Sequence, residues 1–202
     1  MQSTYRYFII NKPFNMLSQF ESKVQDNLLG DVSFDFPEGI HAVGRLDKAS
    51  EGLLILTTNK KVTRLLFHDK IPHKRKYLVK VKNKVSEESL GRLRNGINIR
   101  IKGGDHYTTA PCEVSIVQKP AGLFENGEHM NEFPPFTWLL ITITEGKYHQ
   151  IRKMVKVIHH RCQRLIRVAI EDIELDQLAP GEVRELEETS FFELLKITNW
   201  KG

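Results

Sequence analysis

Residues 41–59 read HAVGRLDKASEGLLILTTN, and this stretch places a turn-rich loop directly before an apolar strand. The loop holds Asp47 between two cations, Arg45 and Lys48, and the strand is predicted over residues 53–56. Apolar residues at helical spacing after Asn59 predict a short helix. The stretch therefore predicts a loop, a strand and a helix, with a carboxylate held among positive charges.

Outward from this stretch, apolar and β-branched runs indicate further strands near residues 7–10, 77–81, 112–116, 139–143 and 165–175. The pair Gly103-Gly104 predicts a hairpin turn before residues 112–116, and residues 118–136 are predicted to form a surface loop. Ser86 is placed to cap one helix. Apolar residues at positions 151, 154, 155 and 158 have helical spacing and predict a second helix that buries this apolar side. Many strands with few helices predict an α+β fold rather than a doubly wound sheet.

Length and composition suit one compact unit, because 202 residues with 40% hydrophobic content can bury one substantial core. Two cysteines are too few for a disulfide scaffold. No apolar run reaches membrane-spanning length and no charged-then-apolar leader opens the chain. We therefore expect a soluble, cytoplasmic monomer with no membrane partner.

The charge is mildly basic overall and unevenly distributed. Thirty Lys and Arg against 25 Asp and Glu give a net charge of +5. Residues 147–167 contain no acid and seven basic residues: Lys147, Arg152, Lys153, Lys156, Arg161, Arg164 and Arg167. This segregation favours a polyanion docking on one face, although a merely solvated helix face gives the same pattern.

Nearby cations favour the ionised form of a carboxyl group, which suits Asp47 to nucleophilic rather than general-acid work. A single Asp in a basic loop is, however, more often a turn or cap residue than a catalyst. Its local sequence alone does not decide between these readings.

Four segments together resemble one enzyme family. GRLDKASEGLLILTTN (44–59), RKYLVKV (75–81), EGKYHQIRKM (145–154) and LAPGEVREL (178–186) resemble the ribosomal pseudouridine synthases, both the small-subunit enzymes of type A and their large-subunit relatives. The opening YFIINKPFNMLSQF (7–20) is most similar to the E class of the large-subunit enzymes, which acts on 23S ribosomal RNA.

The resemblance implies a mostly antiparallel, mixed β-sheet core with a few flanking helices and a central active-site cleft. It also implies one catalytic domain over residues 1–202, with two lobes sharing a continuous sheet and no separate N-terminal RNA-binding module. The implied partner is ribosomal RNA, 23S by the similarity of the opening segment.

The resemblance further implies the roles of individual residues. Asp47 is the catalytic aspartate that attacks a flipped-out uridine at its sugar or its base. Tyr77 stacks on the target uracil and helps to remove the base proton, and Arg152 pairs with Asp47. Taken singly, Tyr77 would be read as a core aromatic and Arg152 as a solvated helix residue. The implied RNA contacts are Arg45, Lys48, Lys12, Lys147, His149, Gln150 and Lys153.

The chemistry of uridine isomerisation suits these residue types. The bond from the base nitrogen to the sugar breaks, the base turns, and a bond from carbon replaces it, so no electron, phosphate or water is exchanged. We therefore expect no cofactor and no metal. A paired or stacked uridine must first swing out, at a cost of a few kcal/mol, and be held by stacking and phosphate contacts.

Two alternative functions belong to other classes, and one further pattern could indicate a metal site. A non-catalytic RNA-binding or ribosome-assembly protein could keep the fold as a docking surface, but it would not need Asp47, Tyr77 and Arg152 together. A metal-dependent nuclease would need a carboxylate or histidine cluster, which the sequence does not suggest. The pattern His159-His160-x-Cys162 could be read as a metal site, yet neighbouring helical histidines point in different directions.

Overall fold

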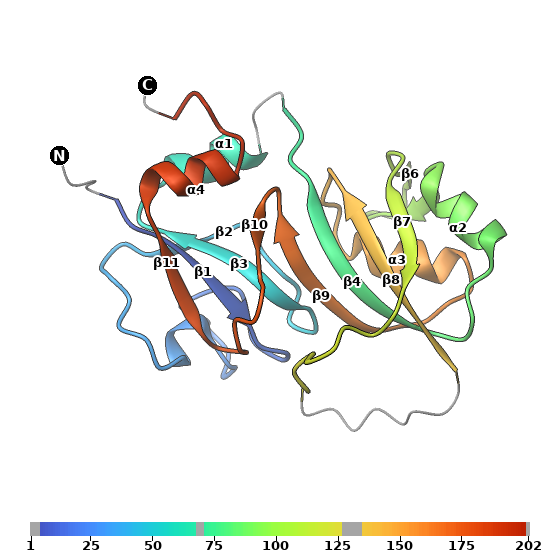
Figure 1. Cartoon of the computed structure of the whole chain (residues 1–202), viewed down its shortest axis with the longest axis horizontal. Helices are drawn as coiled ribbons and strands as arrows, with labels where there is room; N and C mark the ends of the chain where they lie inside the picture. The colour runs from blue at the N-terminus through green and yellow to red at the C-terminus, as the bar shows by residue number, and fades with distance from the viewer. Residues whose placement is uncertain (1–4, 68–70, 127–134, 201–202) are drawn as a thin grey trace. The chain divides into compact units, whose positions relative to one another are not determined.

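The computed structural model describes residues 5–67, 71–126 and 135–200, which fall into two compact units (Figure 1). The first unit comprises Met1–His73 and Arg167–Gly202, and the second comprises Lys74–Ile166. Both chain ends thus belong to the first unit, and the second is a single continuous segment.

The first unit is built around antiparallel strands. They are β1 (Tyr7–Lys12), β2 (His41–Val43), β3 (Glu51–Thr57), β10 (Ile173–Glu174) and β11 (Val183–Leu186). Strand β1 lies between β11 and β3, and β2 pairs with β3 (Figure 1). All six residues of β1 and all seven of β3 are buried. Their near-continuous apolar runs are typical of strands covered on both faces.

Two helices and a 3-10 turn complete the first unit: α1 (Lys61–Phe67), α4 (Glu188–Leu194) and η1 (Leu29–Asp31). The ring of Tyr7 stacks on Phe191 with centroids 4.5 Å apart, and its hydroxyl donates to Glu188 Oε1 at 2.6 Å. Asn59 Nδ2 donates to the same hydroxyl at 3.0 Å. These contacts hold α4 against β1.

The second unit contains the antiparallel order β4-β8-β7, formed by β4 (Arg75–Lys82), β8 (Phe136–Ile143) and β7 (Glu113–Val117). A separate hairpin joins β5 (Asn98–Arg100) to β6 (His106–Thr108). Strand β9 (Cys162–Ile170) begins in the second unit and ends in the first, where it pairs with β10.

Two helices belong to the second unit. Helix α2 (Glu87–Arg94) contacts β7, and Ser86 Oγ caps it by accepting from Ser89 N. Helix α3 (Gln150–Val157) contacts β5 and buries the predicted apolar stripe. Among the residues that the structure describes, no helix has the length and hydropathy needed to cross a membrane.

The predicted α+β class with mostly antiparallel pairing is confirmed, but two local predictions differ. The turn at Gly103-Gly104 leads into the additional strand β6, not directly into residues 112–116. The strand predicted over 165–175 is interrupted by a turn at Glu171, where φ is +47°. Residues 127–134 of the predicted surface loop lie outside the described residues.

Candidate active site

Asp47 lies half-buried on the loop between β2 and β3, in the first unit. Its carbonyl accepts from Ser50 N at 2.8 Å, which closes a turn directly before β3. Earlier in the loop, Gly44 has φ +74°, and a Cβ there would stand 2.7 Å from Phe67 Cζ. Backbone conformation and space both require glycine at that position, so the loop path before Asp47 is tightly defined.

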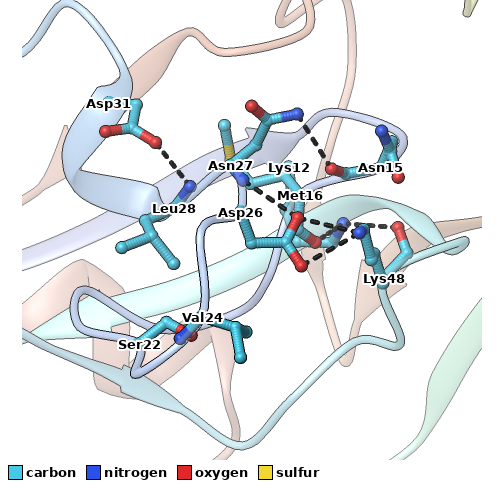
Figure 2. Close-up of polar contacts among 10 residues, drawn as sticks. All are labelled: Lys12, Asn15, Met16, Ser22, Val24, Asp26, Asn27, Leu28, Asp31 and Lys48. Carbon is cyan, nitrogen blue, oxygen red and sulfur yellow. Dashed lines mark hydrogen bonds and ion pairs between the residues drawn. The ribbon is translucent and has the colours of Figure 1, made fainter.

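The two cations beside Asp47 differ in their surroundings. Arg45 is exposed, as an RNA contact requires, and that role stays a prediction. Lys48 Nζ forms an ion pair with Asp26 Oδ1 at 2.8 Å, although 44% of its side chain remains exposed (Figure 2). The structure therefore gives Lys48 a partner within the protein that the sequence did not indicate.

Lys12 differs from its expected role as an RNA contact. Its side chain is 0% exposed, and Nζ donates to the carbonyls of Pro13 and Met16 at 2.8 Å each and of Lys48 at 3.5 Å. Burial lowers the pKa of Lys12 to about 8, while the charges of Glu51 and Asp47 oppose that shift. An ammonium enclosed by backbone carbonyls cannot reach a phosphate, so the expectation of a direct RNA contact is wrong for this structure.

The buried lysine makes the stability of the protein depend on pH. Below about pH 8 the native and unfolded chains both carry the proton, and the native state bears the full cost of burying it. Between about pH 8 and the ordinary lysine value of 10.5, the unfolded chain binds the proton more tightly than the native one, so this contribution to stability rises with pH. Urea unfolding of wild type and Lys12→Met at pH 7 to 10 measures the difference.

The expected result is that wild type gains stability relative to Lys12→Met as pH rises through that window. The matched control is Lys23→Met, at an exposed lysine of the same unit, which should keep the wild-type pH dependence. Parallel curves for wild type and Lys12→Met would contradict the prediction.

Tyr77 lies in β4 of the second unit, opposite Ile141 of β8, and only 9% of it is exposed. Its backbone is thus fixed by a full strand pairing. A ring held in this way has little rotational freedom to lose when a base stacks on it.

Arg152 lies half-buried on α3, also in the second unit. Its guanidinium donates through Nη1 to Cys162 Sγ at 3.6 Å. Burial raises the pKa of the Cys162 thiol to about 11, although the charge of Arg152 opposes the shift. The thiol is therefore neutral near pH 7 and does not cancel the positive charge of Arg152.

Gln150 also differs from its expected role as an RNA contact. It is buried, its Nε2 donates to Glu145 Oε1 at 2.6 Å, and its Oε1 accepts from Lys147 N at 2.8 Å. Glu145 also accepts from Tyr107 OH at 2.5 Å and from Ala110 N at 3.0 Å. Both polar ends of the Gln150 side chain are thus used inside the protein, where they fix the start of α3. Glu145 is the first residue of the EGKYHQIRKM segment. It links Gln150 to Tyr107, which lies 38 positions earlier in the chain.

The other expected contacts before and on α3 form a basic and aromatic surface. Lys147 is exposed, with Nζ 4.5 Å from the ring centroid of Tyr107. Tyr148 is 68% exposed and stacks on His149 at 3.8 Å, and Lys153 Nζ lies 5.3 Å from the same tyrosine ring. Exposed cations beside aromatic rings suit contacts to phosphates and bases.

The basic stretch 147–167 is only partly a surface. Arg164 and Arg167 are buried, with Arg164 Nη2 donating to Phe124 O and Arg167 Nε to Leu53 O at 2.7 Å each. Lys147, Lys156 and Arg161 are exposed. The expectation that all seven cations share one solvated face is therefore wrong, because β9 carries the last two into the core.

No metal-holding cluster of three or more His, Cys, Asp or Glu residues occurs within the described ranges. In the His159-His160-x-Cys162 pattern, His160 Nδ1 lies 2.8 Å from Lys82 O, and Cys162 contacts Arg152. These side chains have structural partners of their own.

Comparison with known proteins decides the family. A model described as RNA pseudouridylate synthase matches residues 6–156. The chain belongs to this family. It is therefore an RNA-modifying isomerase, and the family resemblance seen in the sequence is confirmed.

Several curated relatives are similar over most of their length. The chain is 33% identical over 174 residues to ribosomal large subunit pseudouridine synthase E of Xanthomonas axonopodis pv. citri, covering 85% of this chain and 89% of the relative. It is 35% identical to the protein of the same name from Vibrio vulnificus, covering 90% and 75%. Ribosomal small subunit pseudouridine synthase A of Yersinia pestis is 26% identical, with 90% and 69% covered.

Solved structures support the fold. A crystal structure of a pseudouridylate synthase matches with a TM-score of 0.75 at 25% identity, covering 96% of this chain and 75% of that one. Human RNA pseudouridylate synthase domain containing 1 matches with a TM-score of 0.57 at 14% identity, covering 98% and 94%, which bears on the fold alone.

Proposed function

We propose that this enzyme converts a specific uridine of large-subunit (23S) ribosomal RNA to pseudouridine, with Asp47 as the nucleophile. The observation that carries the proposal is the half-buried carboxylate of Asp47 on a defined loop, within the segment that resembles the family hallmark. Two relatives named as large-subunit enzymes are 33% and 35% identical, whereas the small-subunit relative is 26% identical. That difference favours the large-subunit substrate.

The reaction balances without a cofactor or metal. Asp47 attacks the sugar or the base of the extruded uridine, and the bond between the base nitrogen and the sugar breaks. The base turns and bonds to the sugar through carbon, and the bond between Asp47 and the substrate breaks, which restores the carboxylate. The proton on that carbon leaves, and the freed nitrogen takes up a proton. Substrate and product are isomers, so the protein must supply a nucleophile, a proton acceptor and a surface that holds the loosened base.

Tyr77 and Arg152 complete the proposed chemistry. Tyr77 stacks on the uracil and assists removal of the base proton, and Arg152 pairs with the carboxylate of Asp47. The support for these two roles is the resemblance of the segments that contain Tyr77 and Arg152 to the family's motifs. The family match over residues 6–156 includes parts of both units, which supports the inference that residues 1–202 form one catalytic domain.

The proposed RNA contacts are the exposed cations Arg45 and Lys147, the half-buried Lys153 and His149, and Lys48, whose side chain is 44% exposed beside its ion pair. A surface that neutralises phosphates releases counterions, so each contact contributes about 0.7 to 0.9 to the slope of log affinity against log salt. The ribosomal RNA substrate leads us to place the enzyme in the cytoplasm, and we infer that it acts as a monomer.

The test of function is a map of pseudouridines in ribosomal RNA from cells with and without this protein. One or a few large-subunit sites should lose the modification and regain it when the wild-type gene returns. Purified protein should also modify transcribed large-subunit RNA in the presence of a chelator and without nucleotide. An unchanged map, together with an inactive purified protein, would instead support a docking protein that kept the fold.

The RNA surface at α3 has its own test, which is the salt dependence of RNA binding. Lys147→Ala should weaken binding for all RNA sequences and reduce the salt slope by about 0.7 to 0.9, because one phosphate contact is lost. Lys147→Arg keeps the charge and should keep the slope. Filter binding or anisotropy between 50 and 300 mM salt measures the slope. An identical slope for the alanine variant would show that Lys147 does not contact an RNA phosphate.

A further inference from the structure

A single buried hydroxyl holds the residue directly before Asp47. Ser18 Oγ donates to Leu46 O at 2.8 Å and accepts from Leu46 N at 3.0 Å, and both residues are buried. The two residues are 28 positions apart in the chain. Both backbone polar groups of Leu46 are therefore satisfied by one side chain from outside the loop.

Lys48, the residue directly after Asp47, is held by residues close to Ser18 in the sequence. Lys48 O accepts from Asn15 N at 3.0 Å and from Lys12 Nζ at 3.5 Å. Figure 2 shows the side chain of Lys48 extending to Asp26, whose Oδ2 accepts from Nζ at 2.9 Å. Asp47 is thus bracketed on both sides by residues 12–26, which we term the anchoring segment.

The anchoring segment is itself fixed by contacts to the residues that follow it. Asn27 Nδ2 donates to Asn15 O at 3.2 Å, and Leu17 N donates to Asn27 O at 2.9 Å. Leu29 N donates to Gln19 O at 3.0 Å. These bonds fold the segment back on the residues after it, and Figure 2 shows Asn27 bonded to Asn15 and Asp26 bonded to Lys48.

We propose that Ser18 and Asp26 are positioning residues of the reaction. Ser18 holds the backbone of Leu46 before Asp47, and Asp26 holds the side chain of Lys48 after it, so that the carboxylate of Asp47 meets the substrate at a fixed place. The inference rests on the proposed role of Asp47. Neither side chain needs to touch the RNA. Near-attack geometry tolerates little error, and a displacement of about 1 Å in a reacting group can cost about 100-fold in rate.

Removing the Ser18 hydroxyl tests the inference most directly. Ser18→Ala leaves the buried N–H and C=O of Leu46 without their partner, which favours a shift of the loop toward water or other donors. We expect kcat to fall about 10- to 100-fold while KM for the RNA stays within about twofold, because the anchoring segment acts on the nucleophile and not on RNA affinity. Steady-state kinetics on a transcribed RNA measures kcat and KM separately.

Matched variants separate positioning from stability. Ser18→Thr keeps the hydroxyl and should recover most of kcat, whereas Ser33→Ala removes an exposed hydroxyl nearby in sequence and should behave as wild type. Asp26→Asn breaks the ion pair with Lys48 and should lower kcat by about two- to fivefold, because a partly exposed pair contributes modestly. Asp35→Asn, at an exposed position of the same unit, is its control.

Each result decides something. Wild-type kcat in a folded Ser18→Ala enzyme, with Asp47→Asn inactive, would overturn the positioning role and leave the proposed function standing. Activity in Asp47→Asn would overturn the proposed function itself. If the loss of kcat in Ser18→Ala equals its unfolded fraction at each temperature, Ser18 contributes only to stability and the positioning role is overturned. If Ser18→Ala does not fold, Ser18→Thr and Asp26→Asn decide, and a rise in KM with unchanged kcat for Asp26→Asn would overturn the inference.

Discussion

Asp47→Asn is expected to lower the rate of pseudouridine formation by about 10⁴-fold or more, because the amide has nearly the shape of the carboxylate but is a far weaker nucleophile. Single-turnover reactions with excess enzyme, followed by chemical mapping of pseudouridine, measure the rate without interference from product release. A rate within about tenfold of wild type would contradict the nucleophilic role.

The fold should survive the Asp47→Asn substitution, since the loop is held by contacts that do not use the carboxylate. Ser50 N bonds to the carbonyl of Asp47, and the anchoring segment holds Leu46 and Lys48. The thermal midpoint should therefore stay close to that of the exposed control Asp35→Asn. RNA binding should also persist, because the cations that contact phosphates are unchanged.

Asp47→Asn should also change a neighbouring group that can be observed without turnover. The charge of Asp47 raises the pKa of Lys12, which burial lowers to about 8, so removing that charge should lower this pKa further. Nitrogen-15 NMR of the Lys12 ammonium measures the titration. An unchanged pKa would show that the carboxylate is not electrostatically coupled to Lys12.

Tyr77→Phe is expected to lower kcat by about 10²- to 10⁴-fold, the usual range for losing a group that assists proton transfer. The ring and its packing in β4 remain, so affinity for RNA should stay near that of wild type. Steady-state kinetics and anisotropy together separate the two quantities. Unchanged kcat would restrict Tyr77 to stacking.

Tyr77→Leu separates stacking from proton removal. It removes the hydroxyl and the aromatic face together, and stacking of a base on an aromatic ring is worth about 1 to 3 kcal/mol. Binding of RNA with an extruded uridine should therefore weaken in Tyr77→Leu but not in Tyr77→Phe. The control is Tyr5→Phe, an exposed tyrosine of the first unit, which should leave both rate and affinity unchanged.

Much of the fold was predictable because the signals are local. The apolar runs of β1 and β3 and the helical stripe of α3 are visible in contiguous sequence, and the structure confirms each. Strand β6 was missed, since its three residues, His106–Thr108, carry no apolar alternation and pair only across a turn.

The candidate site was predictable to a different extent for different residues. Motif resemblance singled out Asp47, Tyr77 and Arg152, whose roles remain proposals for experiment, and the family itself is confirmed. The assignments of Lys12 and Gln150 to the RNA surface failed. Both residues lie inside segments that resemble the family, but resemblance to a motif does not say whether a polar side chain faces solvent.

The sequence by itself determined the α+β class, the principal strands, the helix of the third motif and the enzyme family. Only the tertiary structure decided that Lys12 is enclosed by carbonyls, that Lys48 pairs with Asp26 and that Ser18 holds Leu46. The physical reason is the separation along the sequence of the residues that determine each feature. Strand and helix patterns depend on residues a few positions apart, whereas the burial and pairing of a polar group depend on which distant segment covers it, as residues 12–26 cover the loop of Asp47.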